Sequence, residues 1–308
     1  MSINYTIIIP HHNIPELLDR CLSSIPRRYD VQIIVVDDCS DKEYLPAIHE
    51  VEQKFPGVVF VYDKEGGGGG HARNVGLTFA QGKYIMFADA DDFFNDCFNA
   101  ILDDFIEAEE DLIFFKGNSV DTDTYLPAHR ADHLNSYIDA YLKGGDKEGN
   151  LLRYKFGEPW ARMVKSSVIF DNDILFDDTK IHNDTTYAYL VGYYGKTFRV
   201  DTRPLYCVTV RSGSVSARSD ANKIKTRVAV FARAEQFYKA HNIPMEVTEH
   251  YVQLARLLAH RKFSLYNACC KIITDYGTPM SCVFVKTVKT FCSILMRRQL
   301  CGRKGRIL

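Results

Sequence analysis

The first 120 residues alternate short β-branched runs with helical stretches, and this pattern constrains the fold more than any other feature. The pattern predicts strands at residues 5–9, 31–36, 58–62, 84–88 and 112–115. It predicts helices between them at residues 15–25, 43–55, 71–80 and 97–107, with Asn13 as cap of the first. Near-continuous apolar strands alternating with helices are typical of a mostly parallel sheet covered on both faces. The expected fold class is therefore α/β.

The remainder of the chain changes character twice. Residues 118–160 are irregular, and a helix is predicted at 185–194, followed by strands at 197–200 and 205–210. From Ala221 the pattern is helical, with segments at 224–240, 247–270 and near 280–300. We therefore expect one α/β domain over residues 1–216 and a helical extension over 217–308.

Charge and composition exclude several classes of protein. The chain has 38 basic and 39 acidic residues, a net charge of -1, so wholesale nucleic-acid binding is not expected. Hydrophobic residues make up 46%, which excludes a disordered chain. No apolar run approaches the roughly 20 residues that span a bilayer, and the N-terminus shows no secretory leader. A cytoplasmic protein is expected.

Polar clusters follow four consecutive predicted strands. They lie at residues 10–13, 37–40, 66–74 and 89–92. In open α/β sheets ligands bind at the carboxyl ends of the strands. We therefore expect these clusters to form one site for a polyanionic ligand and a metal ion.

The acidic cluster Asp89-Ala90-Asp91-Asp92 is the candidate metal site. Alternate carboxylates at a strand end can supply the oxygen ligands that hard divalent cations prefer. The alternative is an acidic turn that caps the next helix.

The glycine run at residues 66–70 fits a relaxed dinucleotide fingerprint. However, the run follows the third strand rather than the first, and no acidic residue closes a strand about 20 residues later. A Rossmann-type cofactor site is therefore rejected. The run is interpreted as a mobile segment whose backbone can approach the ligand closely.

Seven short motifs in order resemble those of the family 2 glycosyltransferases of bacterial polysaccharide synthesis. They are TIIIPHHN at 6–13, IIVVDDCS at 33–40, ARNVG at 72–76, GKYIMFADADD at 82–92, EPWARM at 158–163, IHNDT at 181–185 and RSGSVS at 211–216. The resemblance covers residues 4–216 and not the helical extension. It implies the GT-A fold, with a nucleotide-sugar-binding half at 1–117 and an acceptor-side half at 118–216.

The resemblance also implies roles for individual residues. The nucleotide-sugar-binding residues would be Pro10, His12, Asn13, Asp37, Asp38, Arg73, Asp89, Arg211 and Ser214. Asp91, with Asp89, would bind a divalent metal ion (Mn2+ or Mg2+) that holds the diphosphate. Asp184 would be the general base toward the acceptor hydroxyl, and Trp160 would form an apolar floor for the acceptor sugar.

Structural alternatives exist for three of these residues. Asp184 could cap the helix that follows it, Arg211 could be a surface charge, and Trp160 could belong to the core.

Three residues depart from the family pattern. His12 stands where an aromatic residue is common, Cys39 where glycine is usual, and Asn183 where glutamate is frequent. The change at His12 affects stacking on the nucleobase, and the change at Asn183 weakens the assignment of Asp184 as the general base.

The first hypothesis is a metal-dependent, inverting glycosyltransferase that moves a sugar from a UDP-type donor to a saccharide or lipid-linked saccharide acceptor. A related nucleotidyl- or phosphoryl-transferase is the second hypothesis, since a carboxylate–metal site on an α/β sheet suits that chemistry. The third is a non-catalytic sugar-binding protein of the same fold.

The C-terminal segment carries eight basic residues and one acidic residue between Lys271 and Leu308. Phe284, Val288, Phe291 and Leu295 form one apolar stripe of a helix, with basic residues on the opposite side. This pattern favours a helix at an anionic membrane surface, peripheral on the inner face of the cell membrane. The alternative is that the stripe packs on the preceding helices.

Overall fold

The computed structural model describes residues 2–211 and 220–301. The chain divides into two compact units, Met1–Ser214 and Val215–Leu308. Ser214, one of the predicted donor-binding residues, lies outside the described residues.

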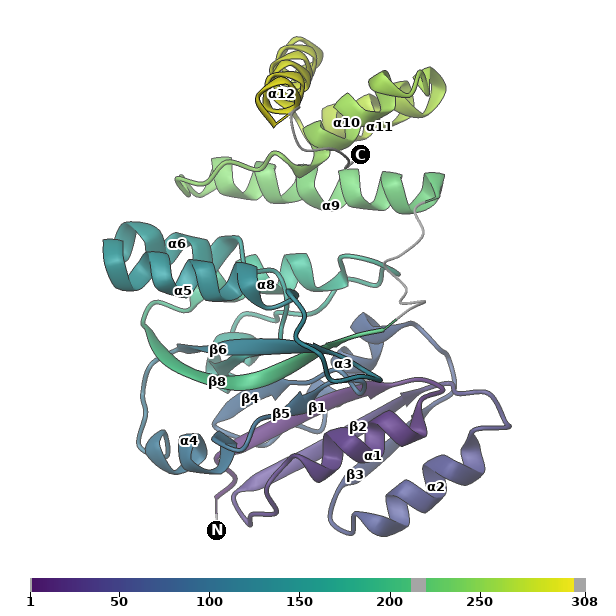
Figure 1. Cartoon of the computed structure of the whole chain (residues 1–308), viewed down its shortest axis with the longest axis vertical. Helices are drawn as coiled ribbons and strands as arrows, with labels where there is room; N and C mark the ends of the chain where they lie inside the picture. Colours follow the sequence, from purple (N-terminus) through teal and green to yellow (C-terminus); the bar gives the residue numbers. More distant parts are fainter. Residues whose placement is uncertain (1, 212–219, 302–308) are drawn as a thin grey trace. The chain divides into compact units, whose positions relative to one another are not determined.

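The first unit is built on one eight-stranded sheet in the order β3-β2-β1-β4-β7-β6-β8-β5 (Figure 1). The strands are β1 Tyr5–His11, β2 Val31–Asp38, β3 Val59–Asp63, β4 Tyr84–Phe87, β5 Phe93–Phe94, β6 Leu112–Asp121, β7 Arg162–Lys165 and β8 Phe198–Val210. Strands β1 to β4 are parallel to one another, whereas β5 and β7 pair antiparallel with their neighbours. The α/β fold class with a mostly parallel sheet is confirmed.

Helices alternate with these strands. They are α1 Pro15–Ser23, α2 Leu45–Lys54, α3 Gly69–Leu77, α4 Phe98–Asp104, α5 Asp132–Gly144, α6 Asp146–Tyr154, α7 Ser166–Phe170 and α8 Asn183–Tyr194. Strand order reverses at β1, which has β2 on one side and β4 on the other. Because crossover connections are right-handed, this reversal puts α1 and α2 on one face and α3 on the other. The reversal point, between β1 and β4, is where such sheets bind ligands.

Burial explains why these segments form a sheet. Ile7, Ile8 and Ile9 of β1 are fully buried, as are Ile85 of β4 and Ile113 of β6. Continuous apolar runs of this kind fit strands that are covered on both faces. Gly76 of α3 lets its helix approach β1, because a Cβ there would stand 2.4 Å from Cγ2 of Ile8.

Three segments differ from the sequence-based prediction. The two strands predicted at 197–200 and 205–210 form one strand, β8, because Phe198–Val210 pairs with β6 along its length, with only register shifts. The predicted helix at 247–270 is wrong: it is interrupted near Arg261, which has a left-handed φ of 55°. The irregular region at 118–160 contains α5 and α6, whose periodicity was obscured by Gly144 and Gly145.

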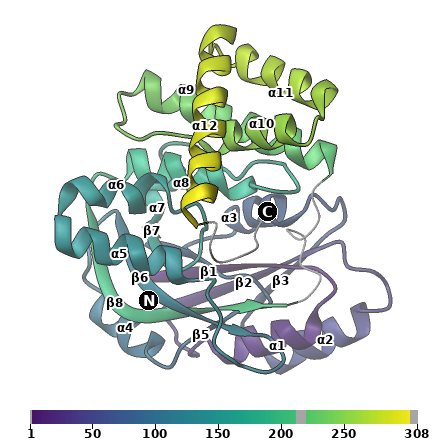
Figure 2. The ribbon, with the colours of Figure 1, turned by 45° about the horizontal axis from the view of Figure 1, so that its top comes forward.

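The second unit is helical, as predicted. It contains α9 Ala221–Ala240, α10 Glu249–Ala259, α11 Phe263–Asp275 and α12 Met280–Cys301 (Figure 2). Its own core includes Val228, Tyr251 and Leu254, all buried. Within 2–211 and 220–301, no helix has the length and apolar character that crossing a bilayer requires.

Candidate active site

The carboxylate of Asp37, at the end of β2, already has hydrogen-bond partners on both oxygens. The Asp37 side chain is buried; its Oδ1 lies 2.8 Å from Nδ1 of His11 and accepts a hydrogen bond of 2.6 Å from Oγ of Ser40. Its Oδ2 accepts from the Ser40 backbone N–H at 3.0 Å. Burial alone would raise the pKa of Asp37, but the hydrogen bonds from His11 and Ser40 outweigh it and keep that pKa below its usual value. Asp37 is therefore a structural anchor of this strand end.

The neighbouring Asp38 anchors the glycine run. Its Oδ1 and Oδ2 accept hydrogen bonds of 2.9 and 2.8 Å from the backbone N–H groups of Gly67 and Gly68. Gly68 has φ 85°, in the region that favours glycine, and precedes the first turn of α3. The run is thus tied to the end of β2 through Asp38.

His12 and Asn13 complete this edge. Nδ1 of His12 lies 2.9 Å from the backbone oxygen of Asp38. Asn13 does not cap α1, contrary to the prediction; its amide instead exchanges two hydrogen bonds of 2.8 Å with Asp41. Pro10 precedes them in β1, beside Val36 of β2. The residues predicted to contact the nucleobase therefore lie together at the carboxyl ends of β1 and β2.

The acidic cluster after β4 has a different environment. Asp92 is buried and accepts a hydrogen bond of 2.6 Å from the backbone N–H of Thr209. Burial, followed by the charges of Asp89 and Asp91, raises the pKa of Asp92 well above its usual value. Burial and the Asp89 charge also raise the pKa of Asp91, against the opposing effect of Arg211. This strand end therefore concentrates negative charge.

Two arginines neutralise part of that charge. Arg73 of α3, which is buried, donates from Nη2 to Oδ1 of Asp89 at 2.5 Å. Nε of Arg211 lies 3.1 Å from Oδ2 of Asp91. Arg211 is therefore ion-paired within the cluster, and the alternative of an isolated surface charge is not what the structure shows.

Arg73 also connects the acidic cluster after β4 to the start of α8. Its Nη1 donates to Oδ1 of Asn183 at 3.3 Å, and its guanidinium lies 5.3 Å from the ring centre of Phe176. Gly70 makes this approach of α3 to α8 sterically feasible, since a Cβ there would stand 2.8 Å from Cβ of Asn183. One buried guanidinium thus joins Asp89 to the residue that precedes Asp184.

Asp184 lies in the first turn of α8 and is not its cap, which is His182. Burial raises the pKa of Asp184 to about 6, with Arg73 opposing the rise and Glu158 adding to it. The alternative that Asp184 caps this helix is therefore wrong, because the helix begins at Asn183, one residue before Asp184. A half-buried carboxyl with this pKa suits a general base near neutral pH.

The residues of the acidic cluster fit a divalent cation held partly by substrate. Oδ1 of Asp89 accepts a hydrogen bond from Arg73, and Oδ2 of Asp91 is ion-paired with Arg211, so the second oxygen of each carboxylate could bind a metal ion. Among the described residues no group of three or more His, Cys, Asp or Glu side chains is arranged for metal binding. Mg2+-type sites commonly take one or two carboxylates and fill the remainder with water and phosphate oxygens. The donor set is all oxygen and matches that pattern.

Trp160 does not line an open surface. Its side chain is 2% exposed and stacks on Tyr206 with ring centres 5.7 Å apart. Its position favours the alternative of a core residue that supports the site from beneath.

Sequence reasoning missed several partners of the site. Tyr206 stands behind the acidic cluster, with its hydroxyl oxygen 2.8 Å from the backbone N of Asp89. Glu158, within a motif already singled out, has Oε2 3.2 Å from Nε2 of His133. Burial would raise the pKa of Glu158, but His133 lowers it below the usual value. Glu158 had a sequence signal because it stands in that motif. Tyr206 had none, because it lies 117 residues from Asp89 in the chain.

Comparisons with known proteins bear on this geometry. The chain is 30% identical to poly(ribitol-phosphate) beta-N-acetylglucosaminyltransferase TarS of Staphylococcus aureus (strain Mu50 / ATCC 700699) over 95 residues, which are 30% of this chain and 17% of that protein. It is 32% identical to minor teichoic acid biosynthesis protein GgaB of Bacillus subtilis (strain 168) over 118 residues, 36% of this chain and 13% of that one. The chain thus spans under a fifth of either relative.

Solved structures share the fold. The crystal structure of S. aureus TarS 1–349 in complex with UDP-GlcNAc has a TM-score of 0.65 at 18% identity, covering 98% of this chain and 93% of that one. Mannosyltransferase PcManGT from Pyrobaculum calidifontis, in complex with GDP-Man and Mn2+, has a TM-score of 0.52 at 15% identity, covering 94% and 87%. These likenesses confirm the GT-A fold.

The family model for glycosyl transferase family 2 matches residues 6–167, more than half of the chain. The matched range contains β2 to β7, nearly all of β1, and the polar residues that follow β1, β2, β3 and β4. The hypotheses of a phosphoryl-transferase and of a non-catalytic binding protein therefore give way to that of a sugar-transferring enzyme. This chain belongs to glycosyl transferase family 2.

Proposed function

We propose that the protein transfers a sugar from a UDP-type donor to a hydroxyl group of a saccharide acceptor, with a divalent cation and with inversion at the anomeric carbon. The observation that carries the proposal is the Arg73 bridge. It joins Asp89, on the donor side, to Asn183, which adjoins the base Asp184. One buried guanidinium that bonds a donor-side carboxylate and the residue next to the acceptor-side base fits a reaction in which both substrates meet.

The donor occupies the carboxyl ends of β1, β2 and β4. Pro10, His12 and Asn13 form one side of the nucleoside site, and Asp37 and Asp38 hold its floor and the glycine run. The solved TarS structures contain UDP-GlcNAc and UDP, which supports a uridine donor. Arg211 contacts the diphosphate on the side of Asp91.

The chemistry requires charge neutralisation and proton removal. A divalent cation held by Asp89 and Asp91 would neutralise charge on the leaving diphosphate. Arg73 and Arg211 orient these two carboxylates through the ion pairs described above. Asp184 accepts the proton of the acceptor hydroxyl as the new C–O bond forms and the bond to the diphosphate breaks. One base and attack opposite the leaving group give inversion, and the nucleoside diphosphate leaves free.

The acceptor is proposed from the relatives. TarS is named for transfer to poly(ribitol phosphate), and GgaB for minor teichoic acid synthesis. We take the acceptor to be a saccharide or lipid-linked saccharide of a cell-surface polymer.

The C-terminal helix supports peripheral association with an anionic membrane. Phe284, Val285 and Val288 of α12 are 60%, 62% and 40% exposed, so this part of the stripe does not pack on the preceding helices. Lys286 is not available to lipid, because Nζ lies 2.5 Å from Oε1 of Glu235, whereas Lys289 is exposed. An exposed apolar face beside basic residues is typical of interfacial helices. Such a protein would be cytoplasmic and bound at the inner face.

Liposome sedimentation tests the proposed association with an anionic membrane. The full chain should pellet with vesicles containing phosphatidylglycerol and not with pure phosphatidylcholine vesicles, and Phe284→Glu with Val288→Glu should abolish pelleting. Equal pelleting of the variant and the unmodified chain would remove the membrane proposal.

A donor screen tests the enzymatic proposal. The purified protein is incubated with Mn2+ and UDP-, GDP- or dTDP-sugars, and release of the nucleoside diphosphate is measured. We expect slow hydrolysis of a UDP-sugar that stops when the metal is chelated. Release of pyrophosphate or of a nucleoside monophosphate instead would contradict sugar transfer.

A further inference from the structure

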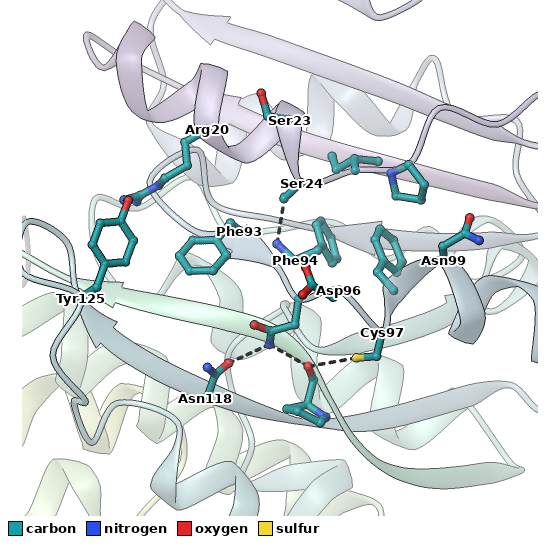
Figure 3. Close-up of a pocket in the computed structure, with 15 residues that line it drawn as sticks. Arg20, Ser23, Ser24, Phe93, Phe94, Asp96, Cys97, Asn99, Asn118 and Tyr125 are labelled. Atoms are coloured by element: carbon teal, nitrogen blue, oxygen red, sulfur yellow. Dashed lines mark hydrogen bonds between the residues drawn. The ribbon is translucent and has the colours of Figure 1, made fainter.

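An open pocket of about 900 Å³ lies along β5, and none of the residues that line it is assigned above to the donor or to proton transfer. Its walls come from the end of α1, from β5, from the start of α4 and from the turn that carries Tyr125. Figure 3 shows Arg20 and Tyr125 at one end, Asn99 at the other, and Phe93 between them. The proposed function leaves this pocket without a role.

One end of the pocket reaches the catalytic region through Arg20. The Arg20 guanidinium donates to the backbone oxygen of Asp91 and, at 3.4 Å, to that of Thr122. Asp91 directs its carboxylate to Arg211 and is separated from Phe93 by a single residue. A molecule in the pocket would therefore lie directly behind the proposed metal-binding loop.

The rim of the pocket exposes an aromatic ring that is held in place. The Tyr125 side chain is 55% exposed, and its backbone φ of 56° is unfavourable for a residue other than glycine. The Arg20 guanidinium lies 5.9 Å from the centre of this ring and 5.3 Å from that of Phe93. A Tyr side chain suits an interface because its ring is apolar and its hydroxyl is polar, and here Arg20 holds the exposed ring in place.

The pocket also presents a fixed pair of amides. Nδ2 of Asn95 donates to Oδ1 of Asn118 and to the backbone oxygen of Pro204, both at 2.7 Å. Neither bond uses the other polar atom of each amide, Oδ1 of Asn95 and Nδ2 of Asn118. A fixed acceptor beside a fixed donor matches hydroxyl groups, which donate and accept at once. Because the amides already hold each other, little rotamer entropy is lost on binding.

The geometry points to a second carbohydrate site: this pocket binds a stretch of the hydroxyl-rich acceptor chain beyond the unit that reacts. The exposed Tyr125 ring offers apolar contact to the C–H groups of a sugar or polyol, and the amide pair binds its hydroxyl groups. The inference rests on the proposed function, since the occupant is the acceptor. It deepens that function by giving the enzyme a preference for long acceptors.

Binding measurements on the full chain test the site with two probes, poly(ribitol phosphate) and maltohexaose. Tyr125→Gly removes the ring and suits the left-handed backbone. Asn118→Asp keeps the oxygen that pairs with Asn95 and removes the free donor. Tyr29→Ala is the matched control, because Tyr29 is 76% exposed and does not line the pocket.

We expect at least one probe to bind the unmodified protein and each pocket variant to weaken that binding by about fivefold, the equivalent of roughly 1 kcal/mol for one aromatic contact. The control should bind unchanged. Binding of the polyol phosphate alone would assign an anionic chain, and binding of maltohexaose a neutral one. Absence of binding by either probe, or equal binding by the variants, would overturn the site.

Calorimetric titration of UDP with Mn2+ separates this result from the proposed function. All three variants should bind UDP as the unmodified protein does. If UDP binds and both carbohydrate probes fail, the second site is refuted and the donor site stands. If UDP does not bind the unmodified protein, the proposed function fails whatever the probes do.

Discussion

The carboxylates at the end of β2 and those after β4 flank the same strand, β1, yet their environments are opposite. Asp37 is buried and receives three hydrogen bonds. Burial alone would raise its pKa, but the hydrogen bonds from His11 and Ser40 outweigh burial and keep the pKa below the usual value. Asp91 has one arginine, and burial together with the Asp89 charge raises its pKa. The first strand end is complete in the protein alone, whereas the second retains negative charge that a cation can neutralise. The comparison separates carboxylates that build the site from those that act in it.

The largest effect is expected at the base. Asp184→Asn should lower the rate of sugar transfer by about 10³-fold, within the range typical of general base catalysis. UDP binding should remain, because the substitution is isosteric and leaves Asp89 and Asp91 intact. Nucleoside diphosphate release and UDP calorimetry measure the two properties. Turnover near the unmodified rate would place the base elsewhere.

Asp91→Asn should remove the dependence of UDP binding on Mn2+. We expect the gain in UDP affinity on adding Mn2+ to be lost, since a carboxylate ligand becomes a neutral amide. Calorimetry with Mn2+ and with EDTA measures it. Asp103→Asn is a matched control in an exposed helix residue. Unchanged metal dependence in Asp91→Asn would show that the cation lies elsewhere.

Stability should respond in the opposite way at the two strand ends. Asp37→Ala should lower the free energy of unfolding by about 2 kcal/mol, because buried His11 and Ser40 groups lose their partner. Asp91→Asn should leave stability unchanged or slightly raised, since the repulsion with Asp89 is relieved. Urea unfolding of both variants checks this. Equal destabilisation by the two substitutions would contradict the difference between the two strand ends.

The pH dependence of the rate should report Asp184. With its pKa at about 6, the base is deprotonated above that pH and protonated below it. We therefore expect kcat/KM to be level above pH 7 and to fall about tenfold per unit below pH 6. UDP binding measured over the same range identifies any loss due to the donor site. A profile that stays level down to pH 5 contradicts the assignment.

Much of the fold could be predicted from the sequence, because the signals are local. The apolar runs that became β1 to β4 are continuous, and periodicity placed the helices between them. Prediction failed where a tertiary partner decided the outcome. Asn13 pairs with Asp41 rather than capping α1, and β8 is one strand because β6 pairs along its whole length.

Less of the candidate site could be predicted. Motif order indicated Asp89, Asp91 and Asp184, but sequence could not distinguish a cap from a base at Asp184, or a core residue from a platform at Trp160. Those choices depend on burial, which the pattern of neighbouring residues does not reveal.

The sequence by itself determined the alternation of strands and helices and the polar residues that end each strand, since both depend on residues near one another in the chain. Only the tertiary structure decided which carboxylates are neutralised. Their partners come from far along the chain: His11 reaches the Asp37 carboxylate across 26 residues, and the backbone N–H of Thr209 reaches the Asp92 carboxylate across 117. Electrostatic interactions act through space, so the charge available for a ligand is fixed by folding and not by sequence order.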